Sequence, residues 1–113
     1  MLLEIKNKFE FGKSLLDSSQ FNKSIEIFSE LIIFSENLEK NNETKLIIHT
    51  CLTNRGVGKC KLALIENNKQ LYKEGLADFE KALNYIENKE GLIAFDNLIF
   101  GKKELQSFND SNQ

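Results

Sequence analysis

Proline and tryptophan are both absent from this sequence of 113 residues. Proline is the residue that interrupts helices most strongly, so a chain without it can form long ones. No stretch sustains the alternation of apolar and polar residues that marks a half-buried strand. No stretch is apolar over the length that a membrane span requires. The sequence therefore predicts one all-α domain, and we expect no membrane partner.

Cysteine is scarce as well, with Cys51 and Cys60 the only two. Their separation along one helix is roughly 13 Å, and their side chains would point to opposite faces, so they cannot form a disulfide. Unpaired thiols are typical of a reducing compartment, and the N-terminal residues lack the features of a signal peptide. We therefore expect a cytoplasmic protein, with Cys51 in the core and Cys60 partly facing a groove.

The charges are balanced, with 15 basic and 17 acidic residues interleaved along the chain. Nucleic acids and anionic membranes attract patches of basic residues, so neither is an expected partner. The single histidine, His49, has no convincing metal or catalytic partner at helical spacing, and we interpret it as structural or solvated. No pair of acids suited to acid–base chemistry and no phosphate-binding loop is recognisable. These observations predict a protein that is not an enzyme and that uses no catalytic residue, metal or cofactor.

Apolar residues recur at helical spacing in five segments, which turn-forming residues separate; Asn41 or Asn42 is the expected N-cap of the third. The predicted helices span residues 3–16, 21–38, 43–64, 69–87 and 90–105. They form a domain of residues 1–106, with one hairpin at about 3–39, a second at about 43–87 and a capping helix at about 90–105. Residues 107–113 are predicted to form a flexible tail.

Two of these helices carry nearly the same pattern. An aromatic residue is followed at +3, +7 and +10 by a small residue, a second aromatic residue and a small or apolar residue. The first copy is formed by Phe21, Ser24, Phe28 and Leu31, and the second by Tyr72, Gly75, Phe79 and Ala82. These offsets make one stripe of a helix, in which the small residue admits a neighbouring helix and the aromatic ring fills the space beside it.

This stripe resembles the second helix of a tetratricopeptide (TPR) hairpin, whose core contains an Ala-x-x-x-Phe pattern. Gly12 matches the glycine of the family's first helix, and Gly56 matches it in the second hairpin. The connection from Leu31 to Gly56 is longer than the TPR period allows, which is a recurring feature of short co-chaperone and immunophilin-type TPR domains. The resemblance implies two antiparallel hairpins and a capping helix in a right-handed superhelical stack. The alternative is a plain five-helix bundle.

In TPR domains the first helices of the hairpins line a concave groove, so the resemblance implies a peptide-binding surface. Aligning Gly12 with Gly56 gives two sets of residues with the same spacing, each on one helical face. They are Lys6, Phe9, Glu10, Lys13 and Asp17 in one helix, and Thr50, Thr53, Asn54, Val57 and Lys61 in the other. This mixed surface suits an extended or helical peptide. The alternative is an ordinary solvated face.

Co-chaperone TPR domains bind the acidic C-termini of heat-shock chaperones through a carboxylate clamp of lysines, asparagines and an arginine. Only Asn54 clearly matches a clamp position, because Phe9 stands where the first lysine is expected and Lys13 where an asparagine is expected. Several converging cations and amides are needed to offset the desolvation of a carboxylate. We therefore expect no intact clamp and no strong binding of chaperone tails.

Two hypotheses of function follow from the sequence. The first is a TPR-like adaptor, a monomer or weak homodimer, that binds a peptide or helix of a partner protein in this groove. The second is a structural subunit or a self-associating scaffold that uses apolar residues of the last helix, such as Phe95, Phe100 and Phe108.

Overall fold

Five helices form the fold in the computed structural model, which describes residues 2–87 and 92–111. They are α1 (Leu2–Asp17), α2 (Phe21–Glu36), α3 (Asn42–Glu66), α4 (Lys69–Leu83) and α5 (Ile93–Ser111). No strand occurs within the described ranges, so the predicted all-α class is confirmed. None of the helices in these ranges is both long enough and apolar enough to cross a membrane.

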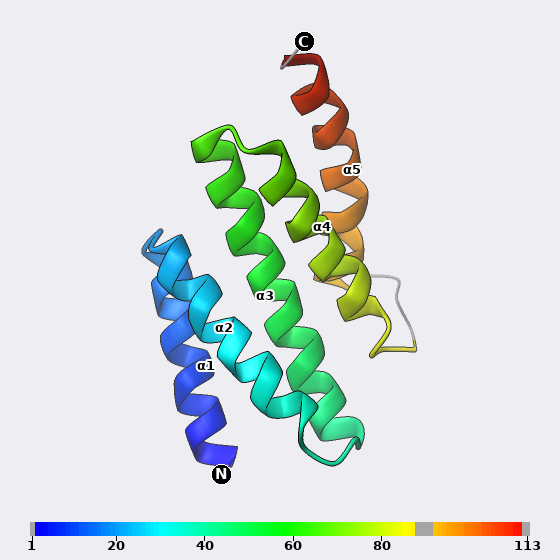
Figure 1. Cartoon of the computed structure of the whole chain (residues 1–113). Coiled ribbons are helices and arrows are strands. Elements are labelled where there is room, and N and C mark those ends of the chain that lie inside the picture. The colour runs from blue at the N-terminus through cyan, green and yellow to red at the C-terminus, as the bar shows by residue number, and fades with distance from the viewer. Residues whose placement is uncertain (1, 88–91, 112–113) are drawn as a thin grey trace.

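The helices are arranged in a row that follows the order of the chain. Each helix packs chiefly on its neighbours in sequence, and the most extensive interface joins α3 to α4. Figure 1 shows α1 and α2 on one side, α3 and α4 in the middle, and α5 at the opposite edge. The first and last helices therefore lie far apart, and α1 also touches α3 over a small area.

All five helices occur where the sequence predicts them, with corrections at their ends. α2 ends at Glu36 rather than at residue 38, and α4 ends at Leu83 rather than at residue 87. An asparagine follows each of these ends, a residue type that favours caps and turns over helix interiors. α5 continues to Ser111 instead of ending at 105, because no glycine or proline interrupts residues 106–111. Its predicted start at residue 90, and the tail residues 112 and 113, lie outside the described residues.

Asparagines define both ends of α3 and the start of α4. The Asn41 side chain accepts a hydrogen bond from the Thr44 backbone N–H at 3.0 Å, and the Asn41 N–H donates to Thr44 Oγ1 at 2.9 Å. This capping box confirms Asn41 as the N-cap. Asn67 ends α3 in the left-handed conformation, and the Asn68 side chain caps α4 by accepting from the Leu71 N–H. Two residues thus suffice to turn the second hairpin.

The two repeated stripes form the centre of the core, since all eight of their residues are buried. In both hairpins the second aromatic residue lies against a glycine of the preceding helix. A Cβ atom added to Gly12 would lie 3.0 Å from Phe28 Cζ, and one added to Gly56 would lie 2.6 Å from Phe79 Cε1. The predicted burial of both stripes is confirmed, and each glycine leaves room for an aromatic ring.

At one point α3 and α4 approach each other backbone to backbone. A Cβ atom on Gly56 would lie 2.8 Å from the carbonyl oxygen of Gly75, and one on Gly75 would lie 2.9 Å from that of Gly56. The two glycines therefore face each other across the helix crossing. This close approach explains why α3 contains Gly56 despite its low helix propensity.

Candidate functional site

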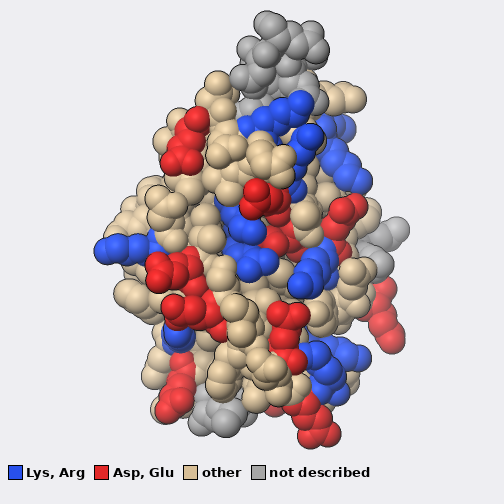
Figure 2. Space-filling view, viewed as in Figure 1, with Lys and Arg blue, Asp and Glu red and all other residues tan. Residues whose placement is uncertain are grey.

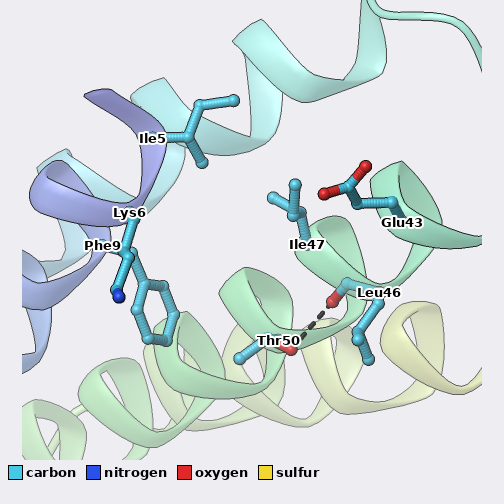
Figure 3. Close-up of a pocket in the computed structure, with 7 residues that line it drawn as sticks. All are labelled: Ile5, Lys6, Phe9, Glu43, Leu46, Ile47 and Thr50. Carbon is cyan, nitrogen blue, oxygen red and sulfur yellow. Dashed lines mark hydrogen bonds between the residues drawn. The ribbon is translucent and has the colours of Figure 1, made fainter. Parts of the chain in front are cut away.

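An open pocket of about 400 Å³ lies between α1 and the first turns of α3. We call it the α1–α3 pocket. It is lined by Ile5, Lys6 and Phe9 from α1 and by Glu43, Leu46, Ile47 and Thr50 from α3. In Figure 3 the residues of α1, among them Lys6, lie on one side of an open space, and those of α3, among them Glu43, lie on the other.

The pocket exists because α1 packs mainly on α2. Residue 9 follows residues 5 and 6 by four and three, and residues 43, 46, 47 and 50 are related in the same way, so each set shares one helical face. Phe9 is held against α2 by an edge-to-face contact with Phe28, with ring centroids 5.7 Å apart and an interplanar angle of 63°. Since Phe9 packs on α2, the beginning of α3 remains uncovered on this side.

The chemistry of the pocket is an apolar floor between two charges. Ile5, Phe9 and Ile47 supply partly or fully buried apolar surface, and the Leu46 side chain is 55% exposed. The Thr50 hydroxyl already donates to the Leu46 carbonyl oxygen at 2.8 Å. Lys6 and Glu43 are exposed, and neither forms an ion pair with another residue that the structure describes. An apolar group with a charge on either side would complement this arrangement.

Three of the ten predicted groove residues line this pocket, namely Lys6, Phe9 and Thr50. The other seven lie outside it: Glu10, Asp17 and Lys61 are exposed, Lys13, Asn54 and Val57 are half-buried, and Thr53 is buried. The Thr53 hydroxyl donates to the His49 carbonyl oxygen at 2.9 Å, and the residue is only 8% exposed, so it presents little surface to a ligand. The Asn54 amide donates to the Thr50 carbonyl oxygen at 2.9 Å. The structure thus brings together the N-terminal residues of the two predicted sets around one pocket, and the remaining residues lie outside it.

Sequence reasoning missed four residues of the pocket: Ile5, Glu43, Leu46 and Ile47. The alignment on the two glycines starts at Lys6 and Thr50, and therefore omits the helical turn that precedes Thr50 in α3. The signal that finds them is helical spacing, because Leu46 and Ile47 stand four and three residues before Thr50. Extending the face of Thr50 by one turn identifies both residues.

A polar cluster that sequence reasoning also missed lies between α2, α3 and α4. The guanidinium of Arg55 donates two hydrogen bonds of 2.8 Å to the buried carboxylate of Asp78, and a third of 3.2 Å to the Ser29 hydroxyl. Lys59 approaches the same carboxylate at 3.2 Å. Every carboxylate oxygen of Asp78 is therefore engaged by a cation. This cluster joins three helices and offers no unpaired base for catalysis.

His49 is buried beside the end of α4. Its Nδ1 lies 2.8 Å from the carbonyl oxygen of Ala82, in the last turn of that helix. A protonated Nδ1 donates to this carbonyl, which supports the structural interpretation of His49 over the solvated one. Within residues 2–87 and 92–111, no three His, Cys, Asp or Glu side chains gather as a metal site requires.

Both cysteines lie in packed surroundings, which corrects the expectation for Cys60. Cys51 is fully buried, as predicted. Cys60 does not face the α1–α3 pocket: its thiol lies against Gly75 and donates weakly to the Tyr72 carbonyl oxygen at 3.8 Å. The pKa of both thiols is raised to about 12, chiefly because they are buried, and the Asp78 charge contributes to the rise at Cys60.

We expect both thiols to react slowly with iodoacetamide at pH 8 in the native protein. A thiol with a pKa of about 12 is roughly 1,000-fold poorer in thiolate at this pH than one at its ordinary value. Mass spectrometry after timed labelling should show at least about 100-fold slower modification in buffer than in urea. Rapid native labelling of Cys60 would contradict its place between α3 and α4.

Comparison with protein-family models, with characterised proteins and with solved structures gives no match for this chain. The resemblance to TPR hairpins therefore rests on the sequence pattern.

Proposed function

We propose that this chain is a non-enzymatic, TPR-like interaction module that receives an apolar side chain of a partner protein in the α1–α3 pocket. One observation carries the proposal. The pocket lies between the two helices that the TPR resemblance implies as the inner pair, and it includes Lys6, Phe9 and Thr50 from the predicted groove. Both thiols are unpaired, which fits a reducing, cytoplasmic setting.

The internal repeat supports the TPR-like part of the proposal. Gly12 and Gly56 occupy aligned positions, and each lies against the aligned phenylalanine of the next helix, Phe28 or Phe79. The additional residues of the second hairpin lie at the end where α3 is joined to α4. There α3 runs ten residues beyond Gly56, whereas α1 runs five beyond Gly12. An insertion of this kind lengthens a hairpin and leaves the packing below it in register.

The character of the pocket supports an apolar anchor rather than a carboxylate clamp. Figure 2 shows acidic and basic side chains interleaved over most of one face of the molecule, with several basic side chains gathered at its upper right. The amide of Asn54, the one residue that matches a clamp position, is bonded to its own helix. A partner helix that inserts an aliphatic or aromatic side chain uses the mode in which amphipathic helices bind apolar grooves.

The proposal is tested by selecting peptides from a displayed random library on the purified protein and comparing two variants. Leu46→Glu places a charge in the pocket. Leu64→Glu is its matched control, because Leu64 lies on the same helix, is 53% exposed against 55% for Leu46, and stands outside the pocket. We expect selected peptides that carry an apolar residue to bind wild type and Leu64→Glu alike. Leu46→Glu should weaken their binding at least about 30-fold, since it leaves a charge facing an apolar group.

Both variants alter exposed side chains, so circular dichroism and the melting temperature should show that they remain folded. Equal loss of binding in both variants, or in neither, would place the peptide elsewhere on the surface. A predominance of peptides that depend on a free C-terminal carboxylate would indicate a clamp and would contradict the proposal.

A further inference from the structure

The outer part of α5 carries an exposed aromatic residue. Ala94, Leu98 and Gly101 are buried, and a Cβ atom on Gly101 would meet the side chain of Leu76 in α4, which fixes the inner face of α5. Phe100 lies away from that face and is 63% exposed. An exposed aromatic side chain on the last helix of a stack is a candidate contact for another molecule.

One acid and one base flank Phe100, as one base and one acid flank the α1–α3 pocket, so the two pairs of charges can match. Asp96 precedes Phe100 by four residues, and Lys103 follows it by three, so both lie within one turn of it. Both are exposed, and neither forms an ion pair with another residue in the described part of the chain. The pocket has a cation from Lys6 on one side and an anion from Glu43 on the other. An acid–aromatic–base face is therefore complementary to a base–apolar–acid pocket when each acid is placed beside a base.

We propose that Phe100 of one copy of this chain enters the α1–α3 pocket of a second copy, with Asp96 beside Lys6 and Lys103 beside Glu43. The inference rests on the proposed function, because it names the partner of the same pocket. A volume of about 400 Å³ is within the range of pockets that enclose small ligands, and it holds a phenyl ring with room to spare.

The two surfaces cannot meet within one molecule. α5 packs on α4 at one edge of the row, whereas α1 lies at the other edge. The contact between copies is therefore heterologous, joining two different surfaces, and it leaves a free pocket at one end and a free Phe100 at the other. One aromatic anchor and two exposed charge pairs make a small interface, so we expect a dissociation constant of about 10–500 µM.

Sedimentation velocity of the purified full chain tests the proposal. Concentrations from about 10 µM to about 1 mM span the dissociation constant expected for an interface of this size. We expect the weight-average mass of wild type to rise with concentration. Phe100→Glu and Leu46→Glu should each remain monomeric over this range, because each removes one of the two surfaces. Leu64→Glu should associate like wild type, since Leu64 belongs to neither surface.

Mixing the two monomeric variants is the decisive experiment. Phe100→Glu retains an intact pocket, and Leu46→Glu retains an intact α5. Their equimolar mixture should therefore form a 1:1 heterodimer, in which Phe100 of the Leu46→Glu chain enters the pocket of the Phe100→Glu chain. Nothing larger should form, because the two surfaces that remain free in this dimer are the two that carry the substitutions. Lys6→Asp should weaken self-association about tenfold, and adding Asp96→Lys to it should restore most of the loss.

The outcomes separate this inference from the proposed function. A wild-type mass that stays monomeric at 1 mM would overturn the self-association, as would a mixture of variants that forms no heterodimer. Either result leaves the Leu46-dependent binding of library peptides as it stands. Conversely, library peptides that ignore Leu46→Glu would refute the proposed function, whatever the sedimentation of the wild-type chain.

Discussion

Replacing Asp78 with alanine is expected to lower the free energy of unfolding by about 3–5 kcal/mol, the cost of removing one partner of a buried ion pair. The Asp78 side chain is 7% exposed, and those of Arg55 and Lys59 are 17% and 15% exposed. Without the carboxylate, two cations would face each other in a site with little water. Urea denaturation followed by circular dichroism measures the loss.

Two further variants make this prediction specific. Glu30→Ala removes one partner of the exposed Lys8–Glu30 pair and should cost less than about 1 kcal/mol, because solvent screens that pair. Adding Arg55→Met and Lys59→Met to Asp78→Ala removes the unpaired cations and should restore part of the lost stability. If Asp78→Ala and Glu30→Ala had equal effects, the cluster between α2, α3 and α4 would have no special role.

Gly56→Ala is expected to destabilise the protein by about 1–3 kcal/mol, although alanine is the better helix former by about 1 kcal/mol. The added methyl group would lie 2.6 Å from Phe79 Cε1 and 2.8 Å from the carbonyl oxygen of Gly75. Helix propensity therefore predicts that Gly56→Ala raises the free energy of unfolding, whereas packing predicts that it lowers it. Packing prevails because the obstructing oxygen belongs to the backbone of α4, and the two helices would have to separate.

Gly58→Ala is the matched control, two residues further along the same helix. The nearest atom to its new methyl group would be Ile25 Cγ1, at 3.3 Å, and a side-chain atom can shift by a few tenths of an ångström. Gly58→Ala should therefore be neutral or stabilising by up to about 1 kcal/mol, as measured by the same urea denaturation. A stabilising effect of Gly56→Ala would show that the close crossing of α3 and α4 does not form.

The number and order of the helices could be predicted from the sequence because both signals are local. Apolar spacing marks each buried face, and asparagines mark the turns, as Asn41 and Asn68 do for α3 and α4. The length of α5 was missed because a polar segment is not in itself a helix stop. A run of polar residues does not by itself show whether a helix ends at its last core residue or continues beyond it.

The candidate site could be predicted only in part, because it depends on where α1 stops contacting α3. Lys6, Phe9 and Thr50 follow from the repeat, which aligns equivalent faces of two helices. The unaligned turn of α3 that holds Leu46 has no counterpart within the matched pattern. The pairing of Arg55 with Asp78 joins residues 23 positions apart on different helices, and a single sequence gives no sign of it.

The packing of each helix on its chain neighbours has a consequence for local motion. In such a row, an end helix can detach without breaking the contacts at the centre, so the free energy of opening should differ along the chain. α3 and α4 share the largest interface, so we expect this pair to open last. α1 is held mainly by α2, so a small displacement of its first turns changes the width of the α1–α3 pocket and leaves the central pair of helices intact. The pocket can therefore adapt to anchors of different size at little cost to global stability.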